Sequence, residues 1–193
     1  MEILGKLFGS PARIKIMRLF LLNPDGAFEN KDIANRSRVS PEITRKEISM
    51  LSGIGFIKKN KNGWILNSSF VYLEQIEILL TGTYTLNKEA ILEMTKKAGK
   101  IKLLIASGTF IKNKDSRVDL LIVGDKIKRK VIEDGLKRME AEIGKELTYA
   151  LFDTAEFLYR FNMYDKLVLD ILDFPHEVIV EVKELSTQVL KKN

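Results

Sequence analysis

The chain has 193 residues, of which 45% are hydrophobic and 30% are charged, a composition typical of globular rather than disordered proteins. No apolar run reaches the roughly 18 residues needed to span a bilayer, and the first residues lack the pattern of a signal peptide. Cysteine is absent and His176 is the single histidine, which excludes disulfides, thiolate chemistry and multi-histidine zinc sites. We therefore expect a cytoplasmic protein with no cofactor and no bound metal.

The net charge of +6 is distributed unevenly along the chain. Residues 1–67 contain 12 lysine and arginine residues and 6 acidic residues, whereas residues 68–193 contain 20 of each kind. Local positive charge attracts a polyanion and releases its counterions on binding. The excess charge in the first third therefore favours a nucleic-acid partner, although a basic surface that serves only solubility explains it equally well.

The first third of the chain contains signals for three helices. Ser10-Pro11 places a capping residue before a proline at the first helical position, which predicts a helix start. Asn30 is expected to cap a short second helix that runs from Lys31 to about Ser37. Ser40-Pro41 repeats the capping signal and opens a third helix, which we expect to end near Ser52.

The third helix is followed by a predicted hairpin. Thr44, Ile48 and Leu51 recur at spacings of four and three, which places them on one stripe of this helix. The opposite face then carries Glu42, Arg45, Lys46 and Ser49. Further along, the pair Asn62-Gly63 separates two strand-like runs, the strongest short hairpin signal in the chain.

Three short helices before a basic hairpin resemble the winged helix-turn-helix domains of bacterial and archaeal regulators, over about residues 3–69. The resemblance implies that helix 41–52 enters the major groove, where arginine and lysine donate to guanine or phosphate, and that the hairpin contacts the backbone or minor groove. The residues that it implies for DNA contact are Ser40, Glu42, Arg45, Lys46, Ser49, Lys58, Lys59, Lys61 and Asn62. We therefore expect a sequence-specific transcriptional regulator that binds double-stranded DNA. A protein-binding role for the same module is the alternative.

Residues 70–97 are expected to form two helices. The first carries an apolar stripe made of Phe70, Leu73, Ile76, Leu79 and Leu80. This stripe is interpreted either as the packed face of a linker or as a dimer interface. A homodimer is expected, because small winged-helix regulators usually need two half-sites.

From residue 98 onward, strand-like and helix-like segments alternate, which favours an α/β domain. Strands are predicted at 101–107, 118–123, 147–152 and 178–182, and helices at 126–145 and 153–172. Asp153, with Glu156 three residues later, predicts the start of the second of these helices. Arg160 and Asp165 on that helix are candidates for a partner contact, although a solvated face explains them as well.

A second motif lies at the end of the first of these strands. The segments Ser107-Gly108-Thr109 and Arg117-Val118-Asp119 resemble the small nucleotidyltransferase domains of the DNA polymerase β type. In that family a glycine-serine turn precedes a strand with two alternate acidic residues, which with a third acid hold Mg²⁺ against a nucleotide triphosphate. Here Thr109 replaces the serine and Arg117 replaces the first acid, Asp119 matches the second, and residues 147–151 contain no third. The resemblance therefore implies a degenerate site at Gly108, Thr109, Arg117 and Asp119 with no catalytic residue.

Several roles remain open for this degenerate site. Arg117 beside Asp119 is interpreted as an ion pair that replaces the metal, which would make the site structural. Alternatively, Arg117 with Lys112 and Lys114 holds a phosphate-bearing ligand, since Gly108 permits close approach of the backbone. The enzyme alternative is an active nucleotidyltransferase that uses the winged helix as a substrate arm, and Arg117 argues against it.

The sequence thus predicts a two-domain protein of mixed α+β and α/β class. A winged helix-turn-helix occupies residues 1–69 and a helical linker residues 70–97. A nucleotidyltransferase-like mixed sheet with flanking helices, which we expect to be inactive because two of its three acids are missing, occupies residues 98–193.

Overall fold

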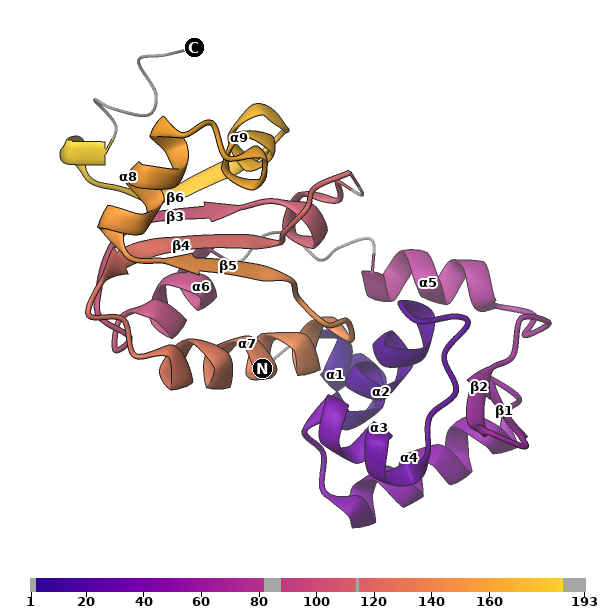
Figure 1. Cartoon of the computed structure of the whole chain (residues 1–193). Helices are drawn as coiled ribbons and strands as arrows, with labels where there is room; N and C mark the ends of the chain where they lie inside the picture. Colours follow the sequence, from indigo (N-terminus) through magenta and orange to yellow (C-terminus); the bar gives the residue numbers. More distant parts are fainter. Residues whose placement is uncertain (1–2, 82–87, 114, 186–193) are drawn as a thin grey trace. The chain divides into compact units, whose positions relative to one another are not determined.

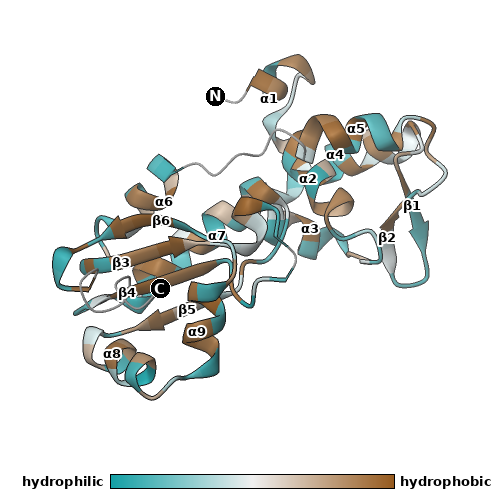
Figure 2. Cartoon of the chain, turned by 90° about the horizontal axis from the view of Figure 1, so that it is seen from above, coloured by the Kyte–Doolittle hydropathy of each residue, from teal (hydrophilic) through white to brown (hydrophobic). Residues whose placement is uncertain are grey.

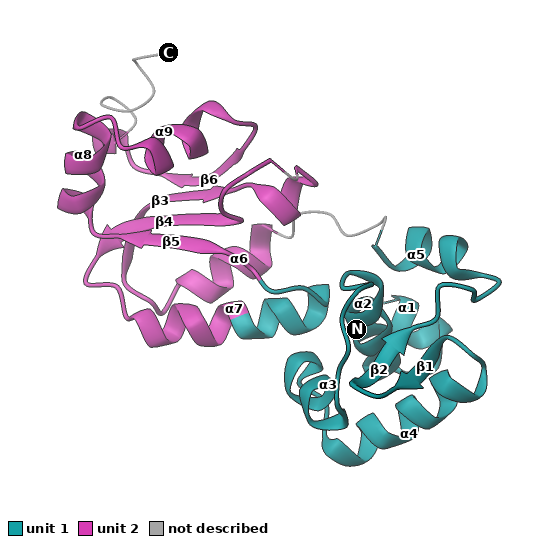
Figure 3. Cartoon of the chain, turned by 45° about the vertical axis from the view of Figure 1, so that its right-hand side comes forward, with its two compact units in different colours: residues 1–84, 137–146 teal, residues 85–136, 147–193 magenta. Residues whose placement is uncertain are grey.

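The computed structural model of the chain describes residues 3–81, 88–113 and 115–185. It is a mixed α/β structure that contains a two-stranded sheet and a four-stranded sheet (Figure 1). The chain divides into two compact units (Figure 3). Unit 1 consists of residues 1–84 and 137–146, and unit 2 consists of residues 85–136 and 147–193. Within the described residues, no helix is both long and apolar enough to cross a membrane.

Unit 1 begins with four helices, α1 (Ile3–Leu7), α2 (Pro11–Leu21), α3 (Asn30–Ser37) and α4 (Pro41–Gly53). The two serine-proline signals are confirmed, because the hydroxyl of Ser10 accepts a bond from the backbone N–H of Arg13 (3.2 Å) and that of Ser40 accepts one from Ile43 (3.4 Å). The expected cap of α3 is wrong by one residue. Glu29 occupies the capping position, and its backbone N–H donates to the carboxylate of Asp32 (3.2 Å).

The predicted hairpin is present as β1 (Ile57–Asn60) and β2 (Gly63–Leu66), which pair antiparallel. Asn60 pairs with Gly63, so that Lys61 and Asn62 form the turn. Gly63 has a φ of +133°, and a Cβ atom there would lie 2.7 Å from the carbonyl oxygen of Phe28. Glycine is therefore required beside the antiparallel bridge between Phe28 and Trp64.

The core of unit 1 is built on α2. Its buried side chains include Ile14, Met17, Phe20, Ile33, Ile48, Leu51, Phe56, Ile57, Leu66 and Leu80. The last of these lies on α5 (Leu73–Thr81), and Phe70, Leu73 and Ile76 pack partly buried against the same core. Four of the five residues of the stripe considered above as a dimer interface therefore pack against the core of unit 1, whereas Leu79 is exposed.

Residues 137–146, which include the second half of α7 (Arg129–Ile143), complete unit 1. Arg18 is only 3% exposed, and its guanidinium donates to the carbonyl oxygens of Leu80 (2.9 Å) and Glu142 (3.1 Å). Asn23 donates in the same way to the carbonyl oxygen of Gly144 (2.8 Å). These bonds occupy carbonyl groups at the ends of α5 and α7, where a helix leaves its own acceptors without partners.

The domain boundaries drawn from the sequence differ from this division. The proposed linker, residues 70–97, does not form a separate unit, because α5 belongs to unit 1 and α6 (Lys88–Thr95) to unit 2. Residues 82–87, within that linker, lie outside the described residues. Residues 137–146, assigned from the sequence to the last domain, belong to unit 1.

Unit 2 contains a four-stranded sheet in the order β5-β4-β3-β6. Its strands are β3 (Lys100–Ala106), β4 (Leu120–Asp125), β5 (Tyr149–Phe152) and β6 (Glu177–Glu181). β4 runs parallel to β5, and β3 runs antiparallel to both β4 and β6. Figure 2 shows β4 as largely hydrophobic, and its residues 120–123 are fully buried. A strand buried on both sides is expected when helices cover both faces of a sheet.

The helices of unit 2 lie on both faces of this sheet (Figure 1). α8 (Thr154–Asn162) and α9 (Lys166–Asp173) cover one face, while α6 and the first half of α7 lie on the other. The prediction of one helix over 153–172 is wrong. Tyr164 adopts a φ of +55°, which ends α8, and Asp165 then caps α9 by accepting from the N–H groups of Leu167 and Val168. The predicted cap of α8 is confirmed, since Asp153 accepts from the N–H of Glu156 (2.7 Å).

Candidate nucleic-acid interface

The outer face of α4 carries the side chains that the sequence singled out. Ser40, Glu42, Arg45, Lys46 and Ser49 are all exposed. Within the described part of the chain, the charged groups of Glu42, Arg45 and Lys46 form no ion pair. The structure therefore brings these residues together on one solvated face with donors and an acceptor available to a partner.

The inner face of α4 is fixed to the rest of unit 1. Thr44, Ile48 and Leu51 are buried, as the spacing predicted. Glu47 is buried beside them, at 4% exposed, and its two carboxylate oxygens accept from Ser10 Oγ (2.6 Å) and Arg13 Nε (2.8 Å). This carboxylate links α4 to the start of α2. It sets the orientation of α4, and sequence analysis missed it because a glutamate in a helix is normally exposed.

The hairpin lysines are exposed but do not all face the same side. Side chains alternate along a strand, so Lys59 shares a face with Ile57, which is buried, and Lys58 points to the opposite face. The ammonium of Lys59 lies 5.8 Å from the centre of the Trp64 ring, on the strand position paired with it. Lys61 is exposed in the turn. Lys58 and Lys59 therefore lie on opposite faces of the hairpin, and contact of each with DNA stays a prediction.

Trp64 and Asn62 order the hairpin. The indole N–H of Trp64 donates to the side-chain oxygen of Asn30 (2.8 Å), the first residue of α3. The backbone N–H of Asn62 donates to the side-chain oxygen of Asn60 (2.8 Å), which closes the turn. The hairpin is thus bonded to α3 through Trp64, close to a turn that the side chain of Asn60 closes.

Three of the four residues of the proposed degenerate site in unit 2 lie close together. Asp119 is 8% exposed, and its oxygens accept from the backbone N–H groups of Thr109 (2.6 Å) and Thr148 (2.8 Å). Gly108 has a φ of +54°, and a Cβ atom there would collide with the Asp119 carboxylate. Gly108, Thr109 and Asp119 therefore form one hydrogen-bonded turn in which the carboxylate is already occupied.

Arg117 does not belong to this turn. Its guanidinium is paired with the carboxylate of Asp170 on α9, so the expected ion pair between Arg117 and Asp119 is wrong. The physical reason is that backbone donors satisfy both Asp119 oxygens, whereas Asp170 offers an acceptor to Arg117. Of the cations proposed to hold a phosphate here, Lys114 lies outside the described residues. Within those residues, no group of three or more histidine, cysteine or acidic side chains is placed to hold a metal ion.

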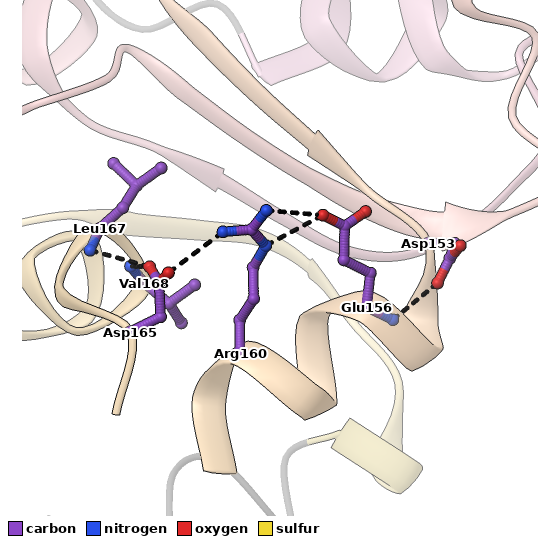
Figure 4. Close-up of polar contacts among 6 residues, drawn as sticks. All are labelled: Asp153, Glu156, Arg160, Asp165, Leu167 and Val168. Carbon is purple, nitrogen blue, oxygen red and sulfur yellow. Dashed lines mark hydrogen bonds and ion pairs between the residues drawn. The ribbon is translucent and has the colours of Figure 1, made fainter. Parts of the chain in front are cut away.

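Arg160 and Asp165, considered above as partner contacts, form an ion pair with each other (Figure 4). Arg160 donates to Glu156 (2.9 Å) and to Asp165 (3.1 Å), and its guanidinium lies 4.9 Å from the centre of the Phe152 ring. The hydrogen bond to Glu156 raises the pKa of Arg160. The N–H of Val168, together with Arg160, lowers the pKa of Asp165. This cluster holds the junction of α8 and α9 together.

A second polar cluster of unit 2 also joins two elements of the fold. Asp125, at the end of β4, accepts from the hydroxyl of Thr154 (2.6 Å) and pairs with Lys102 (3.0 Å). The hydrogen bond from Thr154 is the main cause that lowers the pKa of Asp125, and its bond to Lys102 raises the pKa of that lysine. Asp125 thus links the end of β4 to the start of α8, and its carboxylate is bonded within unit 2.

Comparison with known protein families, with curated proteins and with solved structures finds no match to this chain.

Proposed function

We propose that unit 1 is a winged helix-turn-helix that binds double-stranded DNA, and that the protein is a sequence-specific transcriptional regulator. In this proposal α4 enters the major groove and the β1–β2 hairpin is the wing. Arg45 and Lys46 donate to guanine or to phosphate, and Glu42 accepts from cytosine.

The observation that carries the proposal is the contrast between the two faces of α4. The inner face is held by packing and by the buried bonds of Glu47 to Ser10 and Arg13. The outer face presents the exposed groups of Arg45 and Lys46 without an ion pair in the described residues. A rigid helix with unpaired donors on its outer face suits the reading of base edges, because base contacts require side chains held in a fixed register.

Unit 2 is proposed to be nucleotidyltransferase-like and catalytically inactive. The proposal is supported by Asp119, whose two oxygens accept backbone N–H bonds, and by Arg117, which replaces the first acid and pairs with Asp170. Incubation with labelled nucleoside triphosphates, Mg²⁺ or Mn²⁺ and candidate acceptors should transfer no label. Reproducible transfer that depends on the folded chain would favour the enzyme alternative instead.

A homodimer in the cytoplasm remains part of the proposal, although most of the apolar stripe on α5 packs within unit 1. Light scattering at micromolar concentration measures the oligomeric state, with and without DNA.

The salt dependence of binding tests the proposal. Fluorescence anisotropy of a labelled duplex, titrated with protein at rising salt, should show affinity that falls steeply, because each contacted phosphate releases counterions. Replacing Lys61 by alanine should make the salt slope shallower by about 1 and weaken binding to all sequences alike. Lys6→Ala, which removes an exposed lysine from α1, is the matched control and should change the slope less. Binding that is absent at low salt, or indifferent to salt, would contradict the proposal.

A further inference from the structure

A pocket of about 300 Å³ lies within unit 1, between the end of α3 and residues 137–146. All of its lining residues belong to unit 1. Its wall includes Leu19, a buried residue, and Gly144. This volume is at the lower end of the roughly 300–1,000 Å³ found for small-molecule sites. A pocket of this size suits a compact ligand rather than a polymer.

Basic residues outnumber acidic residues around the pocket. Four of its side chains are basic, namely Arg36, Arg38, Lys137 and Lys145, and two are acidic, namely Glu140 and Glu146. Arg36 pairs with Glu146 at 2.8 Å. Within the described residues, Arg38, Lys137 and Lys145 form no ion pair. Basic groups that converge on one concave surface create a positive potential that favours an anion.

Arg38 has a backbone conformation that an arginine side chain does not favour. It caps the end of α3 with φ and ψ of 51° and 42°, the left-handed conformation. Glycine or asparagine adopts this conformation at lower cost, and helices commonly end on glycine there. A residue kept in a disfavoured conformation points to a use for its side chain. Arg38 is one of the residues that line the pocket.

The walls of the pocket are held in place before any ligand binds. Arg36 lies with its guanidinium 5.1 Å from the centre of the Phe28 ring, which restricts its orientation. Across the pocket, the carbonyl oxygen of Gly144 accepts from Asn23 (2.8 Å). A Cβ atom at Gly144, whose φ is +92°, would lie 2.5 Å from the backbone carbon of Arg18, so the two segments touch. Preorganised walls lower the entropy that binding must remove.

We propose that this pocket binds a small, multiply charged anion of the phosphate-bearing class, no larger than a mononucleotide. Arg38 and Lys145 supply the main charge-assisted hydrogen bonds, and Leu19 supplies an apolar surface. Arg36 and Arg38 lie at the end of α3, directly before α4. A ligand bound to them would therefore contact the turn between these two helices.

Calorimetric titration of the full chain tests the proposal directly. Pyrophosphate, AMP and ADP are titrated separately at constant ionic strength, so that general charge screening is the same in each. Saturable binding of at least one of them is expected. If pyrophosphate alone binds, the site recognises the phosphate groups only, and if ADP binds more tightly, the apolar wall contributes. Absence of saturable binding of all three at millimolar concentration would overturn the proposal.

Two variants and one control locate the binding. Arg38→Gly should raise the Kd of the tightest ligand about ten-fold, and Lys145→Gln about three-fold, because each removes a charge-assisted bond. Lys31→Gln removes an exposed lysine of α3 that does not line the pocket, and should change the Kd by less than about two-fold. Equal losses in all three variants would show a general charge effect and overturn the proposal.

Arg38→Gly also separates lost binding from lost folding. Since glycine suits the left-handed position, this variant should melt at the same or a higher temperature than the wild-type chain. Weaker anion binding without a lower melting temperature supports the site. If instead Arg38→Gly and Lys145→Gln leave anion binding unchanged but weaken binding of duplex DNA, these cations contact the DNA backbone and the proposal is wrong.

Discussion

Arg13 and Glu47, 34 residues apart in the chain, lie 2.8 Å from each other between Nε and Oε2 and join the start of α2 to the inner face of α4. Their side chains are 24% and 5% exposed, so the pair is largely removed from water. Ser10 donates to the second carboxylate oxygen, at 2.6 Å. Both carboxylate oxygens of Glu47 are therefore bonded to the start of α2, and the position of the proposed recognition helix depends on these bonds.

Replacing Glu47 by alanine should destabilise unit 1 by about 3 kcal/mol, because Arg13 and Ser10 lose their partner in a buried place. Urea denaturation followed by circular dichroism measures this change. Glu42→Ala is the matched control on the outer face of the same helix and should change stability by less than about 0.5 kcal/mol. Equal effects of the two substitutions would show that the inner carboxylate does not hold α4.

The opposite orientations of Lys58 and Lys59 are tested by the fluorescence of Trp64, the single tryptophan of the chain. Lys59→Ala should shift the emission of Trp64 and lower stability by about 0.5 kcal/mol, since it removes the cation from the ring. Lys58→Ala should leave the emission unchanged. A larger spectral change from Lys58→Ala than from Lys59→Ala would contradict the strand register.

Asp119→Asn should destabilise unit 2 by about 2 kcal/mol, although the two side chains have the same shape. The amide keeps one acceptor for Thr109 or Thr148 but turns a donor toward the other backbone N–H. Thermal unfolding of the full chain measures the loss. A variant as stable as the wild-type chain would mean that the carboxylate is not needed for structure, and would reopen a catalytic role.

The stability of unit 2 should depend on pH through Asp165. Its pKa is lowered in the folded chain, chiefly by the N–H of Val168 and also by Arg160. A carboxyl group with a lowered folded pKa stabilises the fold above its unfolded value, near pH 4, and this contribution disappears as pH falls through the folded pKa. The difference in free energy of unfolding between wild type and Asp165→Asn should therefore be largest at neutral pH and shrink below about pH 4. A difference that stays constant with pH would refute this role of Asp165.

Local signals in the sequence were sufficient for most of the elements of unit 1. Ser10 and Ser40 cap the helices that they were expected to cap, and the turn before Gly63 forms the expected hairpin. Such signals act over three or four residues, so they can be recognised without knowing the fold. The burial of Thr44, Ile48 and Leu51 followed from helical spacing for the same reason.

What the sequence did not reveal depends on contacts between distant residues. Residues 137–146 belong to unit 1 through bonds such as that from Asn23 to Gly144, 121 residues away. No local pattern distinguishes Glu47 or Arg18 from exposed charges of other helices, yet both are buried. The break at Tyr164 was missed because the surrounding apolar spacing suits one continuous helix.

The central claim is that the outer face of α4 reads base sequence, and selection from a pool of random duplex DNA tests it most directly. The wild-type chain, Arg45→Ala and the control Lys6→Ala are each carried through the selection, and the enriched sites are sequenced. The wild-type chain and Lys6→Ala should enrich the same motif. Arg45→Ala should lose preference at particular base pairs, by about 1–3 kcal/mol for a bidentate contact, and keep it elsewhere. No enriched motif from the wild-type chain, or one motif shared unchanged by Arg45→Ala, would contradict the account.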